Sequence, residues 1–242
     1  MSEISPVTAI IVAAGTGSRM GAQAMPKQFL PVGGIPILAH TLKIFDRAAS
    51  VDHLVLVIRA EDRAICESLV REFQIAKIAA MVDGGQERQD SVLRGLQAAP
   101  AQTEIVLIHD AVRMFITEDM IAQSIRDARQ FGASVVAVPA KDTIKEAHPR
   151  AENDSAVMVV KTHDRRNLWQ IQTPQTFRRD LILACYQQAI AAGFQATDDA
   201  MMAEHFGHPV KIVPGSYRNI KITTPDDLII AEAFYQQEKR NL

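Results

Sequence analysis

The stretch VTAIIVAAGTGSRMG, residues 7–21, decides the fold of this chain. Its first six residues are almost all apolar, and three glycines surround an arginine in its second half. A continuous apolar run of this length is typical of a strand that is buried on both faces of a parallel sheet. Glycines directly after such a strand let backbone N–H groups approach a phosphate, because no Cβ blocks the way. We therefore expect a buried strand followed by a phosphate-binding loop.

The pattern that begins in this stretch repeats through the first 140 residues. Short apolar runs alternate with amphipathic stretches, which predicts an α/β fold with a Rossmann-like, mostly parallel sheet and helices on both faces. The predicted strands are Val7–Val12, Leu54–Ile58, Ile78–Val82, Ile105–Ile108 and Ser134–Val138, and the predicted helices are Pro36–Arg47, Glu61–Phe73, Gln89–Ala98 and Glu118–Phe131. Ligands of such sheets bind outside the carboxyl ends of the strands, so the loops after the first, third and fourth strands are the expected site.

The pattern changes after Pro139. Residues 141–165 are mostly polar, and two extended pieces, Asp142–Lys145 and Ala156–Lys161, flank an AENDS turn. This predicts a projecting β-hairpin arm, which either packs on a partner subunit or lies free on the surface; the sequence leaves both open. Two helical stretches, a strand at Pro209–Val213 and a last helix from about Pro225 follow. We expect residues 1–242 to form one domain.

Composition excludes several classes of protein. The 242 residues carry a formal net charge of −2, which argues against a broad nucleic-acid-binding or membrane-binding surface. The N-terminus lacks a basic signal-peptide region, so we expect a cytoplasmic protein. Cys66 and Cys185 show no metal-ligand spacing and are expected to be buried thiols. Gly207 and Pro209 indicate a helix end, so His205 and His208 are not expected to share a helical face.

Two common nucleotide motifs are excluded for the loop after the first strand. A dinucleotide fingerprint requires G-x-G-x-x-G, but position 20 is methionine, which argues against the alternative of an NAD-dependent dehydrogenase. A Walker A loop requires Gly-Lys, and no Gly-Lys pair occurs in the chain. What remains is a Gly-x-Gly loop with Arg19 inside it and Lys27 after it, and two cations beside such a loop indicate a polyphosphate ligand.

These residues also carry a family resemblance. AAGTGSRMG at 13–21 with MPKQFLP at 25–31 resembles the nucleotide-diphospho-sugar transferase type of nucleotidyltransferase, and the Pro-Lys-Gln narrows this to cytidylyltransferases of sugar-alcohol phosphates. The further motifs are GGQERQDSV (84–92), HDAVR (109–113), DTIK (142–145), DR (164–165), QTPQTF (172–177), TDD (197–199) and NIKITTPDDL (219–228). In that order, from about residue 7 to 235, they resemble the 2-C-methyl-D-erythritol 4-phosphate cytidylyltransferase family.

The resemblance implies a reaction and a set of roles. It implies transfer of CMP from CTP to the alcohol phosphate, with Mg²⁺ as cofactor, in a homodimer whose arms reach into the neighbouring active site. The catalytic residues would be Arg19, Lys27, Arg165 and Lys221; the CTP-binding residues Ala13, Ala14, Gly15, Gly17, Gly84, Gly85, Ser91 and Ala111; the acceptor-binding residues Asp110, Arg113, Thr143, Thr173 and Thr197; and the metal ligand Asp110.

The chemistry fits a site rich in cations. The attacking phosphate is already an anion, so no general base is needed, and positioned cations relieve the charge that gathers in the transition state. One departure from the family stands beside Arg113, where Val112 and Met114 replace an alanine and a proline. We expect this loop to be less constrained than in the family, and we assign no chemistry to His109.

Two further alternatives stay open at this stage. Ribitol-5-phosphate cytidylyltransferases share the MPKQFLP type of motif, although Thr143, Arg165 and the TDD run favour methylerythritol phosphate as acceptor. A nucleotide-binding regulator without catalysis is the other, and it would tolerate loss of Lys27.

Overall fold

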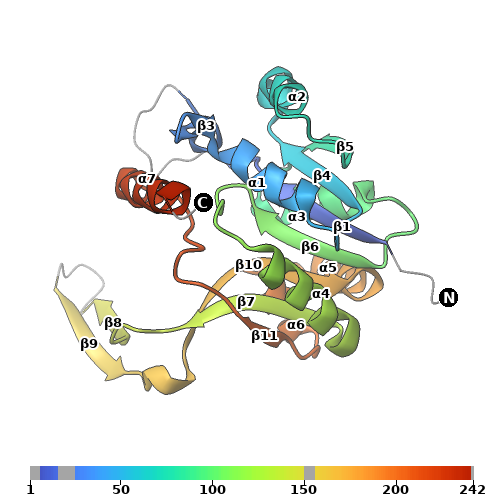
Figure 1. The fold of residues 1–242 in the computed structure, drawn as a ribbon. Helices are drawn as coiled ribbons and strands as arrows, with labels where there is room; N and C mark the ends of the chain where they lie inside the picture. Colours follow the sequence, from blue (N-terminus) through green and yellow to red (C-terminus); the bar gives the residue numbers. More distant parts are fainter. Residues whose placement is uncertain (1–5, 16–24, 150–155, 241–242) are drawn as a thin grey trace.

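The computed structural model describes residues 6–15, 25–149 and 156–240. Within these residues, seven strands form the central sheet in the order β11-β7-β10-β6-β1-β4-β5 (Figure 1). Their bounds are β1 Val7–Val12, β4 His53–Ile58, β5 Ile78–Asp83, β6 Ile105–Asp110, β7 Ala133–Pro139, β10 Trp169–Arg178 and β11 Lys211–Pro214. Two small antiparallel pairs accompany the sheet, β2 (Pro31–Val32) with β3 (Ile35–Pro36) and β8 (Lys145–Pro149) with β9 (Val157–Thr162).

Helices cover both faces of this sheet (Figure 1). They are α1 Ile37–Arg47, α2 Arg63–Glu72, α3 Arg88–Ala98, α4 Glu118–Phe131, α5 Arg179–Ala192, α6 Asp199–His205 and α7 Pro225–Arg240. Alternate residues of β1 enter different cores: Ile11 packs with residues of α1, α2 and α4, whereas Ile10 packs with residues of α3, α5 and α6. The predicted α/β fold with a mostly parallel sheet is therefore confirmed, because each inner strand needs apolar side chains on both faces.

One strand of the sheet was not predicted. β10 runs antiparallel between β6 and β7, pairing Gln175 with Ile108 on one side and with Val135 on the other. Its glutamines Gln170, Gln172 and Gln175 interrupt the apolar pattern that marks the other inner strands. The side chains of Gln172 and Gln175 are nevertheless buried, because they hydrogen-bond to loops beside the site.

One predicted strand is less buried than expected, and one motif forms a loop. β5 is an edge strand whose residues are only half-buried or exposed, so its apolar run does not mean burial on both faces. Residues 219–224, the part of the NIKITTPDDL motif that contains Lys221, form a loop. The loop is held by its own hydrogen bonds, since the Ile222 N–H donates to the Val112 carbonyl and the Asn219 side chain donates to the Thr173 carbonyl.

The arm projects from the sheet as a hairpin of β8 and β9 (Figure 1). Lys145 pairs with Thr162 and Pro149 with Val157, so the first extended piece begins at Lys145, three residues later than predicted. The predicted AENDS turn lies outside the described residues. β9 is not polar: Val157, Met158, Val159 and Val160 are each more than half exposed.

The two cysteines are free thiols in the buried core. Burial raises the pKa of the Cys66 thiol to about 12 and also raises the pKa of Cys185, so both are protonated and poorly nucleophilic at neutral pH. Across the described ranges, no helix combines the length and apolarity that crossing a membrane requires.

Gly95 offers a test of the close packing of α3 on the sheet. A Cβ at this position would lie 2.5 Å from Ile10 Cγ2 and 2.9 Å from Val57 Cγ2, both in the core. We expect Gly95→Ala to lower the free energy of unfolding in urea by about 1–3 kcal/mol, because overpacking outweighs the better helix propensity of alanine. The exposed Gln97→Ala on the same helix is the control, with a change within about 0.5 kcal/mol. A Gly95→Ala variant more stable than the wild type would contradict this packing.

Candidate active site

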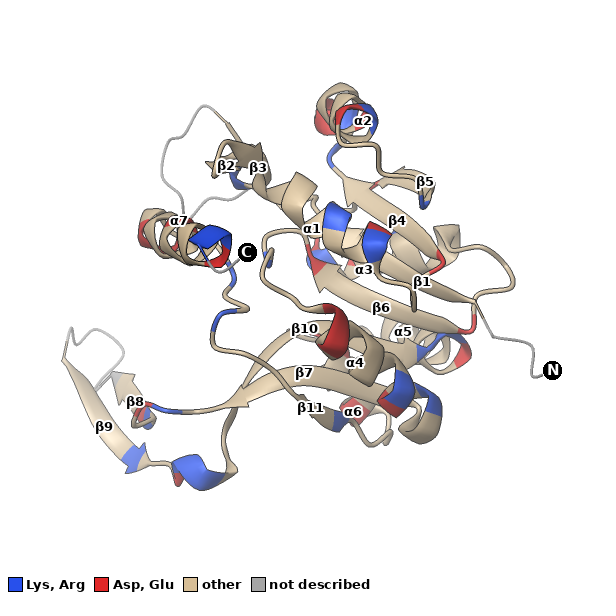
Figure 2. Cartoon of the chain, in the orientation of Figure 1, with Lys and Arg blue, Asp and Glu red and all other residues tan. Residues whose placement is uncertain are grey.

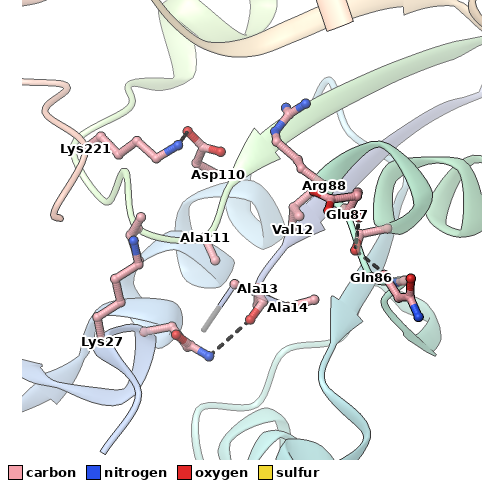
Figure 3. A pocket seen from close by; sticks show the side chains of 15 residues that line it. Val12, Ala13, Ala14, Lys27, Gln86, Glu87, Arg88, Asp110, Ala111 and Lys221 are labelled. Atoms are coloured by element: carbon pink, nitrogen blue, oxygen red, sulfur yellow. Dashed lines mark hydrogen bonds and ion pairs between the residues drawn. The ribbon is translucent and has the colours of Figure 1, made fainter. Parts of the chain in front are cut away.

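A cleft of about 470 Å³ lies at the carboxyl ends of β1 and β6 (Figure 3). The loops after β1, β5 and β6 meet there, as the sheet topology requires. Most of the residues predicted to bind nucleotide line it, and Gly17 and Arg19 lie outside the described residues. The lining is Val12, Ala13, Ala14, Gly15, Lys27, Gln28, Gly85, Gln86, Glu87, Arg88, Ser91, Asp110, Ala111, Val112 and Lys221.

Lys27 reaches this cleft because its neighbour Gln28 is anchored to the sheet. The 3₁₀ turn η2 (Lys27–Phe29) buries the Gln28 side chain, whose Nε2 donates to the Ala13 carbonyl at 3.1 Å and to Asp62 at 3.4 Å. The Ala13 N–H in turn donates to the Val57 carbonyl at 2.7 Å. The Pro-Lys-Gln motif therefore ties Lys27 to the end of β1.

Gly84 and Gly85 bring the loop after β5 close to the loop after β1. A Cβ on Gly84 would lie 2.4 Å from Ala14 Cβ, so the approach requires glycine. The Gly85 N–H donates to Ser91 Oγ at 3.0 Å, and that hydroxyl donates to the Glu87 carbonyl at 3.1 Å. Ser91 thus braces the loop, whereas Glu87 with Asp90 forms the capping box of α3.

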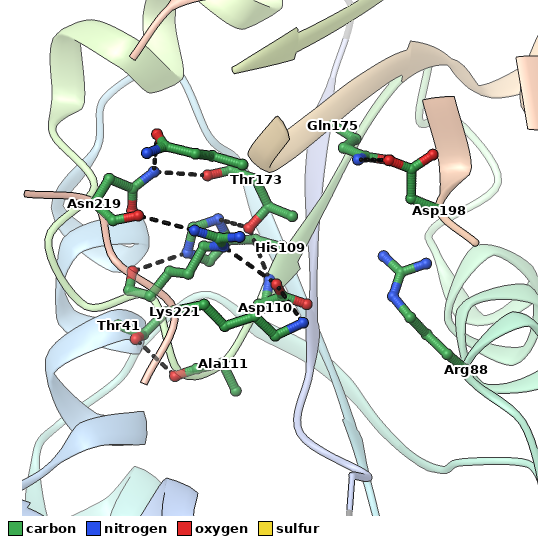
Figure 4. Close-up of polar contacts among 12 residues, drawn as sticks. Thr41, Arg88, His109, Asp110, Ala111, Thr173, Gln175, Asp198, Asn219 and Lys221 are labelled. Atoms are coloured by element: carbon green, nitrogen blue, oxygen red, sulfur yellow. Dashed lines mark hydrogen bonds and ion pairs between the residues drawn. The ribbon is translucent and has the colours of Figure 1, made fainter. Parts of the chain in front are cut away.

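Asp110 is the carboxylate on which the cations of the site converge (Figure 4). Its Oδ2 lies 3.1 Å from Lys221 Nζ and 3.2 Å from Arg113 Nε. Burial by itself would raise the pKa of this carboxyl, but the positive charges of Lys221, Arg113 and Arg88 outweigh burial and hold the pKa well below its ordinary value. Asp110 is therefore ionised at neutral pH.

A second cleft of about 150 Å³ adjoins the first. It contains Arg113, Thr173 and Thr197, three of the residues predicted to bind the acceptor, beside Ile171, Gln172, Gln175 and Asp198. Arg88, Asp110 and Lys221 line both clefts. The structure thus brings the predicted nucleotide and acceptor residues together around shared charges.

Arg88 is a residue of this junction that sequence reasoning missed. Its Nη2 lies 2.6 Å from Asp199 Oδ2, and the buried Asp199 also accepts a hydrogen bond from Tyr186 Oη at 2.6 Å. Burial lowers the pKa of the Arg88 guanidinium, but Asp199 outweighs burial and raises it above its ordinary value. The GGQER motif contained the signal, because an arginine three residues after the glycine pair enters the same cleft.

The loop that carries Arg113 is packed at both positions where the sequence departs from the family, Val112 and Met114. Both side chains are buried in a cluster with Ile222 and α7. Arg113 Nη1 also donates to the Asn219 carbonyl at 2.9 Å. Burial lowers the pKa of the Arg113 guanidinium, whose ordinary value is high enough that it stays charged.

Thr143 and Arg165 line neither cleft of their own chain. Both are exposed at the base of the arm, and Arg165 Nη1 donates to the Lys141 carbonyl at 2.8 Å. The structure of one chain therefore does not bring these two predicted residues to Asp110.

The donor set fits Mg²⁺ only in combination with a phosphate ligand. Among the described residues, no group of three or more His, Cys, Asp or Glu side chains could hold a metal ion. Asp110 offers an ionised carboxylate at the wall shared by the two clefts. Magnesium is commonly held by one or two carboxylates together with substrate phosphates and waters, which is the arrangement this residue allows.

Comparison with known proteins identifies the relatives of this chain. The family model described as "IspD: 2-C-methyl-D-erythritol 4-phosphate cytidylyltransferase" matches residues 7–237. Enzymes of that name from Alkaliphilus oremlandii and Geobacillus kaustophilus are both 47% identical, over 96% and 93% of this chain and 96% and 95% of their own lengths. The crystal structure of a 4-diphosphocytidyl-2C-methyl-D-erythritol synthase from Anaerococcus prevotii is similar with a TM-score of 0.83 and 36% identity, covering 97% of both chains. These matches contradict the alternative of an NAD-dependent dehydrogenase.

The ion pairs at Asp110 predict an order of stability losses. Asp110→Asn leaves the buried Arg113 without its partner, and we expect the free energy of unfolding to fall by about 3 kcal/mol. Lys221 is 36% exposed at its side chain, so Lys221→Gln should cost less than about 1 kcal/mol. Urea unfolding at neutral pH measures both. A larger loss for Lys221→Gln than for Asp110→Asn would contradict the electrostatic description.

Proposed function

This chain belongs to the 2-C-methyl-D-erythritol 4-phosphate cytidylyltransferase family, and we propose that it transfers CMP from CTP to 2-C-methyl-D-erythritol 4-phosphate in non-mevalonate isoprenoid precursor synthesis. The products are the CDP-linked methylerythritol and pyrophosphate. The observation that carries this proposal is the pair of adjoining clefts that share Arg88, Asp110 and Lys221. A transfer between two bound phosphates requires such a shared wall.

The larger cleft is the proposed CTP site. Backbone groups of Gly84 and Gly85, braced by Ser91, suit the edge of a cytosine, and Ala13, Ala14 and Ala111 leave room for the nucleoside. Gly15 and Lys27 lie where the triphosphate would follow, and Gly17 and Arg19 complete the proposed phosphate site.

The smaller cleft is the proposed site of the acceptor phosphate. Arg113 and Lys221 supply positive charge there, and Thr197 also lines this cleft. Asp110 lines both clefts together with Lys221 and Arg88. The carboxylate would also bind the hydroxyl end of the acceptor.

The reaction depends on positive charge close to the reacting phosphates rather than on proton transfer. An oxygen of the acceptor phosphate forms a bond to the α-phosphorus of CTP, and the bond from that phosphorus to the pyrophosphate oxygen breaks. Lys27 and Lys221 flank the cleft and would neutralise the charge that gathers on the phosphoryl oxygens. Mg²⁺, held by Asp110 and the triphosphate, would supply further positive charge.

The arm is the proposed dimer contact. Four consecutive apolar residues of β9 are exposed, and Figure 2 shows most of this strand without charge. Apolar surface of this kind typically marks an interface. Thr143 and Arg165, which line neither cleft of their own chain, would then reach the acceptor site of the partner. Residues 1–242 thus act as one nucleotidyltransferase domain with a dimerisation arm at about 141–165.

The proposed compartment is the cytoplasm. Both cysteines are unpaired thiols, which is the usual state of cysteine in a reducing compartment.

Substrate choice and the role of Lys27 are tested by pyrophosphate release. With CTP, we expect methylerythritol phosphate to give a higher kcat/KM than ribitol 5-phosphate, and Lys27→Ala to lower turnover by roughly 10²–10³-fold. Lys211→Ala, an exposed lysine on β11 outside both clefts, is the matched control and should keep wild-type turnover. Faster use of ribitol phosphate would overturn the choice of acceptor, and full turnover in Lys27→Ala would contradict the catalytic role of Lys27. Binding of CTP without any pyrophosphate release by the wild type would favour the regulator alternative.

Shared active sites are tested by mixing two inactive variants. In a heterodimer of Lys27→Ala and Arg165→Ala chains, one site has both defects, while the other combines an intact cleft with an intact arm. Random exchange of subunits should therefore restore about one quarter of wild-type activity if the dimer has two-fold symmetry. If the arm serves its own chain, every site carries a defect and the mixture stays inactive.

A further inference from the structure

We propose that His109 is a positioning residue of the acceptor site, held as the tautomer with its proton on Nε2, and that it fixes Arg113 and Thr173 relative to Asp110. The inference rests on the proposed function for its kinetic consequence, but the tautomer itself is a property of the free protein. His109 lies in β6 directly before Asp110 and is fully buried.

The hydrogen bonds of His109 lead to two elements of the acceptor cleft (Figure 4). Its Nε2 lies 3.1 Å from the Arg113 carbonyl oxygen, and its Nδ1 lies 3.0 Å from Thr173 Oγ1. The same Thr173 oxygen accepts a hydrogen bond from the Asp110 N–H at 3.1 Å. The imidazole thus joins the loop after β6 to β10 beneath the charged cluster.

The hydrogen-bond partners of His109 and Thr173 determine where their protons lie. A carbonyl oxygen only accepts, so His109 Nε2 must carry the proton that it shares with Arg113. The Thr173 hydroxyl accepts from the Asp110 N–H, and its own proton finds its acceptor at His109 Nδ1. A proton on Nδ1 would leave the buried hydroxyl proton of Thr173 without either of these partners, which is costly in a buried site.

Asn219 completes a ring of hydrogen bonds with His109, Thr173 and Arg113. Its side-chain Nδ2 donates to the Thr173 carbonyl at 3.0 Å, and its backbone carbonyl accepts from Arg113 Nη1 at 2.9 Å. Lys221 follows two residues later and reaches Asp110. The ring therefore fixes the backbone from which both cations of the acceptor site extend.

The ring has a consequence for recognition of the acceptor. The single hydroxyl proton of Thr173 is committed to His109, so Thr173 has no proton to donate to a bound phosphate. Arg113 and Lys221 must supply the donors instead. His109 and Thr173 therefore act on the acceptor through the orientation of Arg113, whereas the CTP cleft contains neither of them.

The tautomer is tested directly on the free enzyme. In ¹⁵N-labelled protein, the ring nitrogens of His109 are assigned through their loss in His109→Phe. We expect a protonated Nε2 coupled to its hydrogen and an unprotonated Nδ1 at neutral pH. Protons on both nitrogens, or on Nδ1 alone, would overturn the proposal whatever the enzyme's activity.

The positioning role is tested by separating acceptor from nucleotide binding. His109→Phe and Thr173→Val should each raise KM for methylerythritol phosphate roughly tenfold, the effect of about one lost buried hydrogen bond. The dissociation constant for CTP, measured without acceptor, should change less than threefold. His109→Gln, whose amide can donate to the Arg113 carbonyl, should recover part of the loss.

The matched control lies on the same strand. Thr176 is a buried threonine of β10 whose hydroxyl donates to Ser124 Oγ, away from both clefts. Thr176→Val should therefore lower stability without raising KM for the acceptor. Equal weakening of CTP and acceptor binding in His109→Phe, or the same KM change in Thr176→Val, would reduce His109 to a structural residue. Absence of any methylerythritol phosphate turnover in the wild type would instead refute the proposed function and leave the tautomer result standing.

Discussion

One buried carboxylate, Asp110, sets the arrangement of the site. Lys221 and Arg113 both bind its Oδ2, and Arg88 adds positive charge from the other side. Like charges so close together would repel each other without this carboxylate, and burial would penalise each of them. Asp110 can hold them only because it ends β6 between β1 and β10, where two loops and the segment 219–221 meet. The position of the strand therefore determines where charge gathers.

Both clefts follow from that placement. The proposed nucleotide side is built from glycine and alanine backbone close to β1, where Gly84 allows two loops to touch. The proposed acceptor side is built from side chains of β10 and the loop at Asn219, which are joined by the hydrogen bonds of His109 and Asn219 to Thr173. A rigid junction suits a reaction that depends on positioning and charge rather than on a proton carrier.

The sequence predicted the parts of the fold that depend on local pattern. The apolar runs of β1, β4, β6 and β7 follow directly from burial on both faces, and glycine spacing indicated the nucleotide loop. β10 escaped prediction because its glutamines bond to distant loops, and no local pattern records that Gln175 meets Asp198. The Arg88–Asp199 pair joins residues 111 positions apart, so only the folded chain brings it together. The packing of the Arg113 loop likewise depends on distant residues, since Val112 and Met114 are buried against α7.

In the proposed reaction, CMP passes directly from CTP in one cleft to the acceptor phosphate in the other, across the wall at Asp110 and Lys221 and without a covalent intermediate on the protein. The stereochemical course at the α-phosphorus tests this most directly, with CTP made chiral by sulfur at that position and methylerythritol phosphate as acceptor. A single in-line displacement predicts inversion of configuration at phosphorus. Retention would require two displacements through a protein-bound CMP, and it would contradict direct transfer between the two clefts.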